Sequence, residues 1–327
     1  MASSPYKAII ITLAILFVFL SSSKADLSSD LSKVYPKCTN LFDIVRGVME
    51  QEIQKDPRTG ASLLRLHFHD CFVDGCDASV LLKDTSTFTG EQSARPNKNS
   101  LRKLEVIDQI KSEVETKCPE MVSCADILAI AARDSVEILS KKKLNYNVEI
   151  GRFDSTTANE TAANNLLPLP TWSISALITN FKNQGLNETD LVLLSGAHTI
   201  GLARCTSFKS RLYNEKDSLD KNFAKNLRAI CSRDDSKTGN KTASLDYQTP
   251  FVFDNSYYKN IIDKKDVLEY DPQFLNNGDT KQLVSKYSND SVVFYQDFGQ
   301  AMIKMGRLKG TTGEKKMEIR KKCWKRN

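Results

Sequence analysis

The sequence is poor in histidine, tryptophan, glycine and proline. Its 327 residues include three histidines, two tryptophans, 14 glycines and nine prolines. So little glycine and proline excludes a collagen or a low-complexity polymer, and 40% hydrophobic residues exclude a wholly disordered chain. After residue 20 there is no apolar run near the roughly 20 residues that a membrane span needs. The three histidines leave few positions for histidine-based chemistry.

The one long apolar run lies at the start of the chain. Residues 8–20 follow Lys7 and precede small polar residues that end at Ala25, a pattern typical of a secretory signal peptide over residues 1–25, cleaved near Ala25. A membrane anchor is the alternative, but the run is too short for it. Cleavage lowers the net charge from +6 to +4, because the segment carries Lys7, Lys24 and no acid. This mild excess does not indicate a nucleic-acid-binding protein.

Export to an oxidising compartment gives the cysteines a structural meaning. All eight lie in residues 26–327, and four disulfides are the expected state, although 105 pairings are open. Four Asn-x-Ser/Thr sequons agree with secretion and glycosylation. These sequons begin at Asn159, Asn187, Asn240 and Asn289.

Apolar periodicity predicts a mainly α-helical protein, built as one interlocked unit or two lobes. A strand is expected only at 146–150, and a loop at 154–170 that ends at Pro168-Leu-Pro170. The expected helices cover 42–55, 61–72, 100–117, 123–140, 173–184, 188–196, 207–213, 221–230, 254–264, 279–289 and 291–305.

Two histidines fall in one of these helices, within residues 65–79. Arg65 and His69 are four residues apart and share a helix face beside Phe68, whereas His67 points elsewhere. Such a pair can act as an acid–base couple toward a small polar substrate, with arginine steadying a developing anion. The alternatives are a buried structural histidine and a zinc site made of His67, His69, Cys71 and Cys76. Zinc is disfavoured because exported thiolates tend to pair.

The third histidine, His198, lies in the segment LSGAHTIG at 194–201. The small residues around it allow a broad, flat group to approach closely, and a neutral imidazole there can be an axial haem ligand. An ordinary helix end with glycine beside histidine is the alternative.

These two segments together resemble class III secretory plant peroxidases. RLHFHDCFVDGCDASVLL (65–82) and LSGAHTIG (194–201) match the distal and proximal signatures of that family, and VSCADILAIAARDSV (122–136) and TPFVFDNSYY (249–258) match further family segments. The resemblance implies an all-α haem peroxidase fold with minimal β structure, two helical lobes with haem between them, and residues 26–327 as a single domain.

The resemblance also assigns roles to residues. It implies that His198 is the proximal ligand of the iron of one haem b and that Asp271 accepts a hydrogen bond from its other nitrogen. On the opposite face, His69 moves the protons of hydrogen peroxide, Arg65 stabilises developing charge, and Asn97 orients His69. Phe68 borders the haem, and Pro168 lies at the edge where donors bind.

Two structural calcium ions and a disulfide pattern follow from the same resemblance. The implied distal ligands are Asp70, Val73, Gly75, Asp77 and Ser79, with Glu91 through water. The implied proximal ligands are Thr199, Asp246, Thr249, Val252 and Asp254. The implied disulfides are Cys38–Cys118, Cys71–Cys76, Cys124–Cys323 and Cys205–Cys231.

The resemblance therefore implies a secreted peroxidase of the extracellular space and cell wall. It reduces hydrogen peroxide at ferric haem through a ferryl intermediate and oxidises phenolic donors in one-electron steps. A monomer is expected, with association to acidic wall polymers as a hypothesis and no nucleic-acid or membrane partner. The family's Ser-Asp-Gln is Tyr270-Asp271-Pro272 here, which bears on the proximal geometry. A peroxidase-fold haem protein with lost or altered turnover and a secreted zinc hydrolase are the alternatives.

Overall fold

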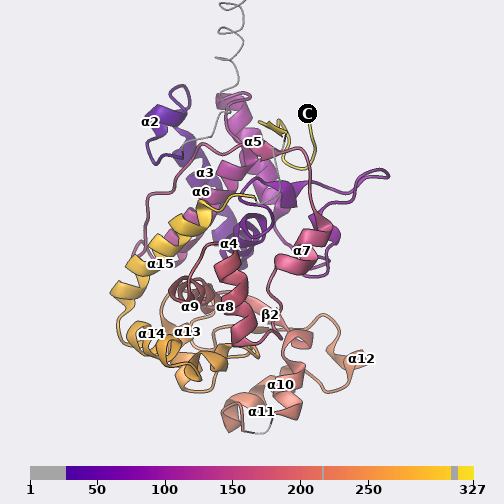
Figure 1. The fold of residues 1–327 in the computed structure, drawn as a ribbon, viewed down its shortest axis with the longest axis vertical. Helices are drawn as coiled ribbons and strands as arrows, with labels where there is room; N and C mark the ends of the chain where they lie inside the picture. Colours follow the sequence, from indigo (N-terminus) through magenta and orange to yellow (C-terminus); the bar gives the residue numbers. More distant parts are fainter. Residues whose placement is uncertain (1–26, 216, 311–315) are drawn as a thin grey trace, which may run out of the picture.

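The computed structural model describes residues 27–215, 217–310 and 316–327, so the expected signal peptide lies outside the described residues. In this part of the chain, helices make two groups that lie one above the other in Figure 1. No helix within these described ranges is both long and apolar enough to span a bilayer.

The upper group is centred on an alanine-rich helix, α6, which contacts α3, α4 and α5. Ser123 begins α6, since its side chain accepts a hydrogen bond from the backbone N–H of Asp126. Helices α4 and α6 approach closely: a Cβ on Gly60 would lie 2.5 Å from Leu139 Cδ1. The upper helices are α2 (Leu31–Val34), α3 (Leu41–Lys55), α4 (Arg58–Cys71), α5 (Leu104–Lys117) and α6 (Cys124–Leu139).

The lower group is arranged around α9, which contacts α8, α14 and α15. Asn187 and Asp190 form a reciprocal capping box at the start of α9. Helix α15 also reaches α4, so it joins the two groups (Figure 1). The lower helices are α8 (Ile174–Asn183), α9 (Glu188–Ser195), η3 (Gly196–Thr199), α13 (Ser256–Ile262), η5 (Asp271–Leu275), α14 (Gly278–Asn289) and α15 (Ser291–Gly306).

Shorter helices lie in the connections between and beside these groups. Those near the upper group are η1 (Ser79–Leu81), η2 (Glu91–Ser93) and α7 (Glu160–Leu166). Those in the lower right of Figure 1 are α10 (Lys209–Asn214), α11 (Lys221–Ile230) and α12 (Asp235–Thr238), and η4 (Cys205–Ser207) directly precedes α10.

The expectation of a loop over 154–170 was wrong for most of its length. Asp154–Ser155 is a short strand, β1, and Glu160–Leu166 is a helix, α7. Asn159 begins this helix, because its side chain accepts a hydrogen bond from the backbone N–H of Ala162. The asparagine that reads as a loop residue and a sequon is therefore also a helix cap.

The β structure is minimal, and the strand expected at 146–150 was also wrong. There, only Ile150 forms an isolated bridge, to Ser28. Tyr146, Val148 and Ile150 are buried while residues between them are more exposed, so the segment has the alternation of a strand. It packs on a helix instead, since a Cβ on Gly299 of α15 would lie 3.1 Å from Tyr146 Cβ.

Two antiparallel ribbons account for the named strands of the described residues. Strand β1 (Asp154–Ser155) pairs with β4 (Met317–Glu318), with Asp154 opposite Glu318. Strand β2 (Leu202–Arg204) pairs with β3 (Thr242–Ser244), with Ala203 opposite Ala243.

The expected helix boundaries agree within a few residues, with one informative exception. The helix expected from 100 begins at Leu104, because Lys103 has a left-handed backbone (φ 66°) and the preceding residues form turns. This non-helical segment directly follows Asn97 and contributes to the site described below.

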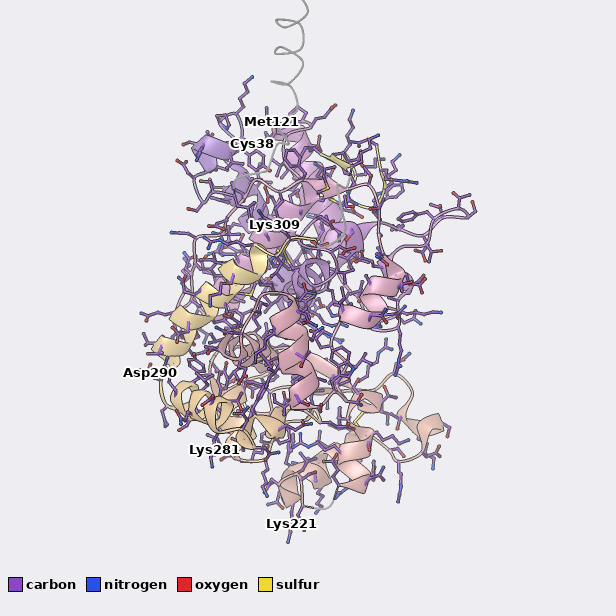
Figure 2. The ribbon with its side chains drawn as sticks, viewed as in Figure 1. Cys38, Met121, Lys221, Lys281, Asp290 and Lys309 are labelled. Atoms are coloured by element: carbon purple, nitrogen blue, oxygen red, sulfur yellow. A yellow bond between two sulfur atoms is a disulfide. The ribbon has the colours of Figure 1, made fainter. Side chains whose placement is uncertain are left out.

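Four disulfides link the described residues, and they are the pairs that the family resemblance implies: Cys38–Cys118, Cys71–Cys76, Cys124–Cys323 and Cys205–Cys231. Figure 2 shows Cys38 near the upper end of the molecule and Lys221 at the opposite end. The disulfide between Cys124 and Cys323 attaches the C-terminal segment to the start of α6.

Candidate active site

Helix α4 carries Arg65, His67 and His69 in its last two turns. The Arg65 side chain donates hydrogen bonds to the carbonyl oxygens of Pro96 (3.0 Å) and Ser100 (3.3 Å). The turn segment 96–100 therefore holds the guanidinium on the same side of α4 as His69, as the i, i+4 spacing predicts. Phe68 extends this region with an aromatic contact to Phe72, at 4.1 Å between ring centroids.

Asn97 fixes the protonation pattern of the His69 ring. Its Oδ1 lies 2.5 Å from His69 Nδ1, and its Nδ2 donates to the carbonyl oxygen of Glu91 at 2.9 Å. Because the amide nitrogen is already used as a donor, the Asn97 oxygen must accept from His69. The proton is then on Nδ1, and the lone pair of Nε2 is free to accept a proton.

The electrostatic surroundings keep His69 in its basic form. Burial lowers the pKa of His69 well below 6.5, and the nearby Arg65 charge lowers it further, against a smaller opposing effect of the Asn97 hydrogen bond. Burial also lowers the pKa of Arg65, to about 10, so the guanidinium remains protonated at neutral pH. Many protein atoms surround the Arg65 side chain, but part of it remains exposed to solvent, as expected for a residue that faces an opening.

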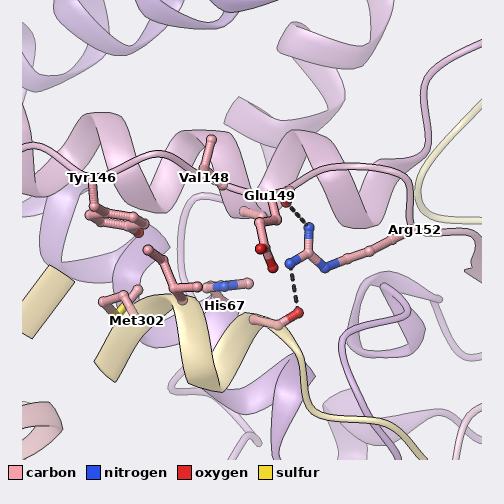
Figure 3. A pocket seen from close by; sticks show the side chains of 9 residues that line it. His67, Tyr146, Val148, Glu149, Arg152 and Met302 are labelled. Atoms are coloured by element: carbon pink, nitrogen blue, oxygen red, sulfur yellow. Dashed lines mark hydrogen bonds between the residues drawn. The ribbon is translucent and has the colours of Figure 1, made fainter. Parts of the chain in front are cut away.

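His67 points away from this pair, toward a small pocket between α6, the 146–152 segment and α15. Figure 3 shows it with Tyr146, Glu149, Arg152 and Met302. Arg152 donates to the carbonyl oxygens of Glu149 (2.5 Å) and Gly306 (2.6 Å) across this pocket. Burial lowers the pKa of His67 to about 3, so it is a neutral core residue.

The zinc alternative fails on this geometry. His67, Cys71 and Cys76 do lie close enough together to hold a metal. However, Cys71 and Cys76 form a disulfide, so neither offers a thiolate. His69 faces Asn97 rather than the cysteines.

The third histidine, His198, lies in η3 and its side chain is 30% exposed. The glycines beside it are needed for close packing. A Cβ on Gly196 would lie 2.5 Å from Tyr258 Oη, and one on Gly201 would lie 3.0 Å from Ala61 Cβ of α4. The contact with Ala61 brings the segment after His198 against the helix that carries Arg65 and His69.

The Nδ1 atom of His198 has a different nearest partner from the expected one. The Tyr270 hydroxyl lies 3.1 Å from Nδ1, whereas the nearest Asp271 oxygen is 4.0 Å away, beyond hydrogen-bonding distance. Asp271 Oδ1 instead accepts a hydrogen bond of 2.6 Å from Tyr257. Asp271 thus lies next to the imidazole as expected, but the direct bond implied by the resemblance is absent from this structure.

A cluster of buried oxygens follows His69 directly. Asp70 Oδ1, Ser79 Oγ and Glu91 Oε2 are buried without a hydrogen-bond partner in the described structure. Burial, with the charge of Asp77, raises the pKa of Asp70 to about 8, and burial and the Asp70 charge raise that of Glu91. Unpaired buried oxygens are rare in proteins, and carboxylate and hydroxyl oxygens grouped in this way could hold a hard cation such as calcium.

The chain turns tightly between these ligands. Gly75 has φ 91°, and a Cβ there would lie 2.6 Å from the backbone nitrogen of Gly310. Ala78 also has a left-handed backbone (φ 58°), and the buried Arg320 donates to its carbonyl oxygen at 2.6 Å. Val73, the other expected backbone ligand, is buried two residues before Gly75.

A second oxygen cluster adjoins His198. Thr199 Oγ1 donates to Asp246 (3.0 Å) and lies 3.2 Å from Asp254 Oδ1, while Thr249 Oγ1 lies 2.9 Å from Asp254 Oδ2. Two carboxylates and two hydroxyls are thus brought together from three segments, with Val252 in the same turn as Thr249. Hard cations such as calcium prefer this oxygen-rich set of ligands.

Comparison with known proteins assigns the chain to a family. A sequence profile described as peroxidase matches residues 45–290. The chain is 52% identical to peroxidase 4 of Vitis vinifera over 328 residues, covering 100% of both chains. It is 47% identical to peroxidase 67 of Arabidopsis thaliana (97% of this chain, 99% of the relative) and 49% identical to peroxidase P7 of Brassica rapa subsp. rapa (89% and 97%). The chain belongs to the class III plant peroxidase family.

Membership of the peroxidase family establishes the activity. Peroxidases are oxidoreductases that act on hydrogen peroxide and an electron donor, and membership implies a haem cofactor. The alternative of a peroxidase-fold protein without turnover is not favoured by relatives that are themselves named peroxidases. The residues fit a haem, because His198 keeps exposed surface and no described residue hydrogen-bonds its Nε2.

Some residues of this peroxidase site could not be found from sequence alone. Tyr270 was singled out only as a departure from the family pattern, and Tyr257 only as part of the 249–258 segment. Neither periodicity nor spacing predicts that both hydroxyls converge on the His198–Asp271 pair. Pro168 follows α7 and is half-buried, and Phe68 is half-buried beside Phe181.

Proposed function

We propose that His69 is the proton-transfer residue of this peroxidase, with Arg65 as the charge-stabilising residue and Asn97 as the residue that orients His69. The orientation of the Asn97 amide carries this proposal, because it leaves His69 Nε2 unprotonated. Nε2 accepts a proton from hydrogen peroxide and returns it to the departing oxygen. Arg65 stabilises the negative charge that develops as the O–O bond breaks.

His198 is the proposed protein ligand of haem b, bound through Nε2. The haem, when bound, supplies the iron at which the O–O bond is cleaved and the two oxidising equivalents are held. Phe68 would border the bound haem, and Pro168 would lie where phenolic donors bind. Soret absorption of the purified protein, and its loss in His198→Gly, tests the assignment of the ligand.

Rapid mixing with hydrogen peroxide tests the His69 assignment. The Soret band of the haem-loaded protein changes on reaction with peroxide, and its rate in His69→Ala should fall steeply while haem remains bound. His67→Gln is the matched control, because His67 lies in the same helix but faces the pocket of Figure 3. An equal loss in both variants argues against the proposal.

Calcium is the proposed occupant of both oxygen clusters. At the distal site the ligands are Asp70, Val73, Gly75, Asp77 and Ser79, with Glu91 through water, and the unpaired buried oxygens there support the assignment. At the proximal site the ligands are Thr199, Asp246, Thr249, Val252 and Asp254. Each ion would support the segment next to one histidine. Metal analysis after dialysis should give two calcium ions per chain.

The proposed mature protein is one secreted domain, residues 26–327, after cleavage of residues 1–25. Contacts of α15 with both α9 and α4 support a single domain. The sequon asparagines Asn187, Asn240 and Asn289 are exposed, which suits glycosylation, whereas Asn159 is half-buried and caps α7. Intact mass and N-terminal sequencing of protein recovered from culture medium test cleavage and glycan occupancy.

A cluster of lysines near the C-terminus supports the proposed association with acidic wall polymers. Lys83, Lys322 and Lys325 surround the Trp324 ring at 5.3, 5.8 and 5.4 Å from its centroid, and all three lysines are exposed. A cluster of ammonium groups attracts polyanions in a salt-dependent manner. The protein is proposed to bind them as a monomer in the cell wall.

Binding to polygalacturonate at low salt tests the wall proposal. Changing Lys83, Lys322 and Lys325 to glutamine should weaken binding, whereas changing Lys221, Lys225 and Lys281 should not. These control lysines are also exposed and lie at the other end of the molecule, where Figure 2 labels Lys221 and Lys281. Equal weakening in both sets indicates net charge alone, and size-exclusion chromatography tests the monomer.

A further inference from the structure

We propose that Tyr270, rather than Asp271, hydrogen-bonds His198 Nδ1 and is the positioning residue that sets the electron donation of this imidazole. The inference rests on the proposed role of His198 as the haem ligand. It concerns a residue that stands where the family has serine.

The distances around His198 favour Tyr270. Its hydroxyl oxygen is 3.1 Å from Nδ1, a normal hydrogen-bond length, and Asp271 Oδ1 is 4.0 Å from the same nitrogen. The two rings lie 6.0 Å apart between centroids at an angle of 49°, so Tyr270 meets the imidazole through its hydroxyl rather than by stacking.

Asp271 has another partner that holds it away from the imidazole. Tyr257 donates a hydrogen bond of 2.6 Å to Asp271 Oδ1, and both side chains are buried. A short hydrogen bond to a carboxylate is a strong one, so the Tyr257 hydroxyl holds Asp271 Oδ1 in its present position. The family carboxylate is thus retained here but is engaged by a tyrosine.

The segment before Tyr270 is fixed in place by a fully buried arginine. Arg211 donates to the carbonyl oxygens of Asp266 (2.9 Å) and Leu268 (2.6 Å) and forms an ion pair with the Asp266 carboxylate. Tyr270 then packs edge-on against Phe274, at 6.2 Å between centroids. The position of the tyrosine hydroxyl therefore follows from a rigid backbone and a packed ring.

The exchange of partner has a chemical consequence. When Nε2 binds iron, Nδ1 carries the proton and donates it in the hydrogen bond. A carboxylate acceptor pulls strongly on this proton and makes the imidazole a stronger electron donor. A phenol is a neutral and weaker acceptor, so an imidazole bonded to Tyr270 donates less strongly to the iron than one bonded to aspartate.

Three variants of the haem-loaded protein test the inference: Tyr270→Phe, Asp271→Asn and Tyr287→Phe. The last is the matched control, because Tyr287 is also buried and its hydroxyl is 3.1 Å from Asp297 rather than near His198. The readouts are the iron–histidine stretching band in resonance Raman spectra and the ferric/ferrous midpoint potential. Neither depends on turnover.

Tyr270→Phe should lower the stretching frequency and make the midpoint potential more positive, because Nδ1 loses its acceptor. Asp271→Asn should produce a smaller shift, and Tyr287→Phe none. An unchanged band in Tyr270→Phe, or a larger shift in Asp271→Asn than in Tyr270→Phe, overturns the inference. If Tyr270→Phe does not retain haem, a large shift in Asp271→Asn alone still overturns it, and an unchanged band there supports it. Absence of any iron–histidine band in the unmodified protein would instead refute the assignment of His198.

Discussion

The two histidine regions of this peroxidase differ in how their hydrogen-bond partners are supplied. On the His69 side, Asn97 lies 28 positions away and offers the expected oxygen at 2.5 Å. On the His198 side, the nearest partner comes from 72 positions away and is Tyr270, not the expected Asp271. The region built from nearby chain matches the family pattern, and the one built from distant chain departs from it.

The difference follows from what fixes each partner. Asn97 is oriented by the carbonyl of Glu91, which lies in η2 only six residues earlier in the chain. The position of Tyr270 relative to Asp271 depends on Phe274 of η5 and also on Arg211 of α10 and Tyr257 of α13, which lie on other elements. A change at one residue therefore alters the proximal arrangement more readily than the distal one.

The largest expected effect tests the distal base. In His69→Ala, the rate of reaction with hydrogen peroxide should fall about 10² to 10⁴-fold, the usual contribution of a positioned general base. Stopped-flow absorbance at the Soret band measures it. A rate within twofold of the unmodified protein would remove His69 from the role proposed for it.

A smaller loss is expected for the residue that orients His69. Asn97→Val removes the oxygen that accepts from Nδ1–H, so a fraction of the ring adopts the tautomer without a free Nε2 lone pair. The same rate should fall about 10 to 100-fold, as is usual for the loss of an orienting partner. Asn97→Asp keeps an acceptor oxygen and should retain more activity. Equal rates in the two variants would contradict the orienting role.

Calcium removal tests the proposed metal site on the His69 side. Removal by a chelator should lower the thermal midpoint, since an ion at 100 times its dissociation constant stabilises the fold by about 2.7 kcal/mol. Asp70→Asn separates two explanations of the buried carboxyl. If Asp70 is a calcium ligand, Asp70→Asn lowers both the calcium content and the thermal midpoint. If Asp70 is instead a protonated carboxyl that binds no metal, Asp70→Asn leaves the thermal midpoint unchanged or raises it.

The smallest expected effect is a flat pH profile. Burial and Arg65 keep the pKa of His69 well below 6.5, so the ring remains the unprotonated base as the pH falls from 8 to 6. The rate constant for reaction with hydrogen peroxide should change little over this range and decrease only at lower pH. A decrease centred near pH 6.5 would indicate a solvent-like histidine and contradict the electrostatic argument.

Local patterns predicted most of the helices, because an apolar stripe and a capping residue are both encoded within a few positions. The positions where α9 and α15 begin follow from Asn187 and Asp290, whose side chains cap the first turns. The strand expected at 146–150 is not formed, because a strand depends on a partner from elsewhere in the chain. Its alternating burial is real, but pairing needs a neighbouring strand, and among the described residues 146–150 only Ile150 forms a bridge, to Ser28.

The features of the site also fall into those that the sequence predicts and those that only the folded structure determines. Arg65 and His69 share a face because four residues make about one helical turn, and this could be read directly from the chain. The separation of His67 into another pocket follows from the same geometry (Figure 3). The contacts of Arg65 with Pro96 and Ser100 could not be read in this way, because they depend on a turn segment that was expected to be helical from residue 100 onward.

By itself, the sequence determined the family, the helical class and the chemistry available at Arg65, His69 and His198, since residue types and short spacings decide these. Only the tertiary structure decided which hydroxyl meets His198 and which buried oxygens remain without partners. The physical reason is the separation along the chain over which each kind of interaction acts. Helix faces and caps act over a few residues, whereas a difference between 3.1 and 4.0 Å at Nδ1 depends on packing among segments that the chain brings together only on folding.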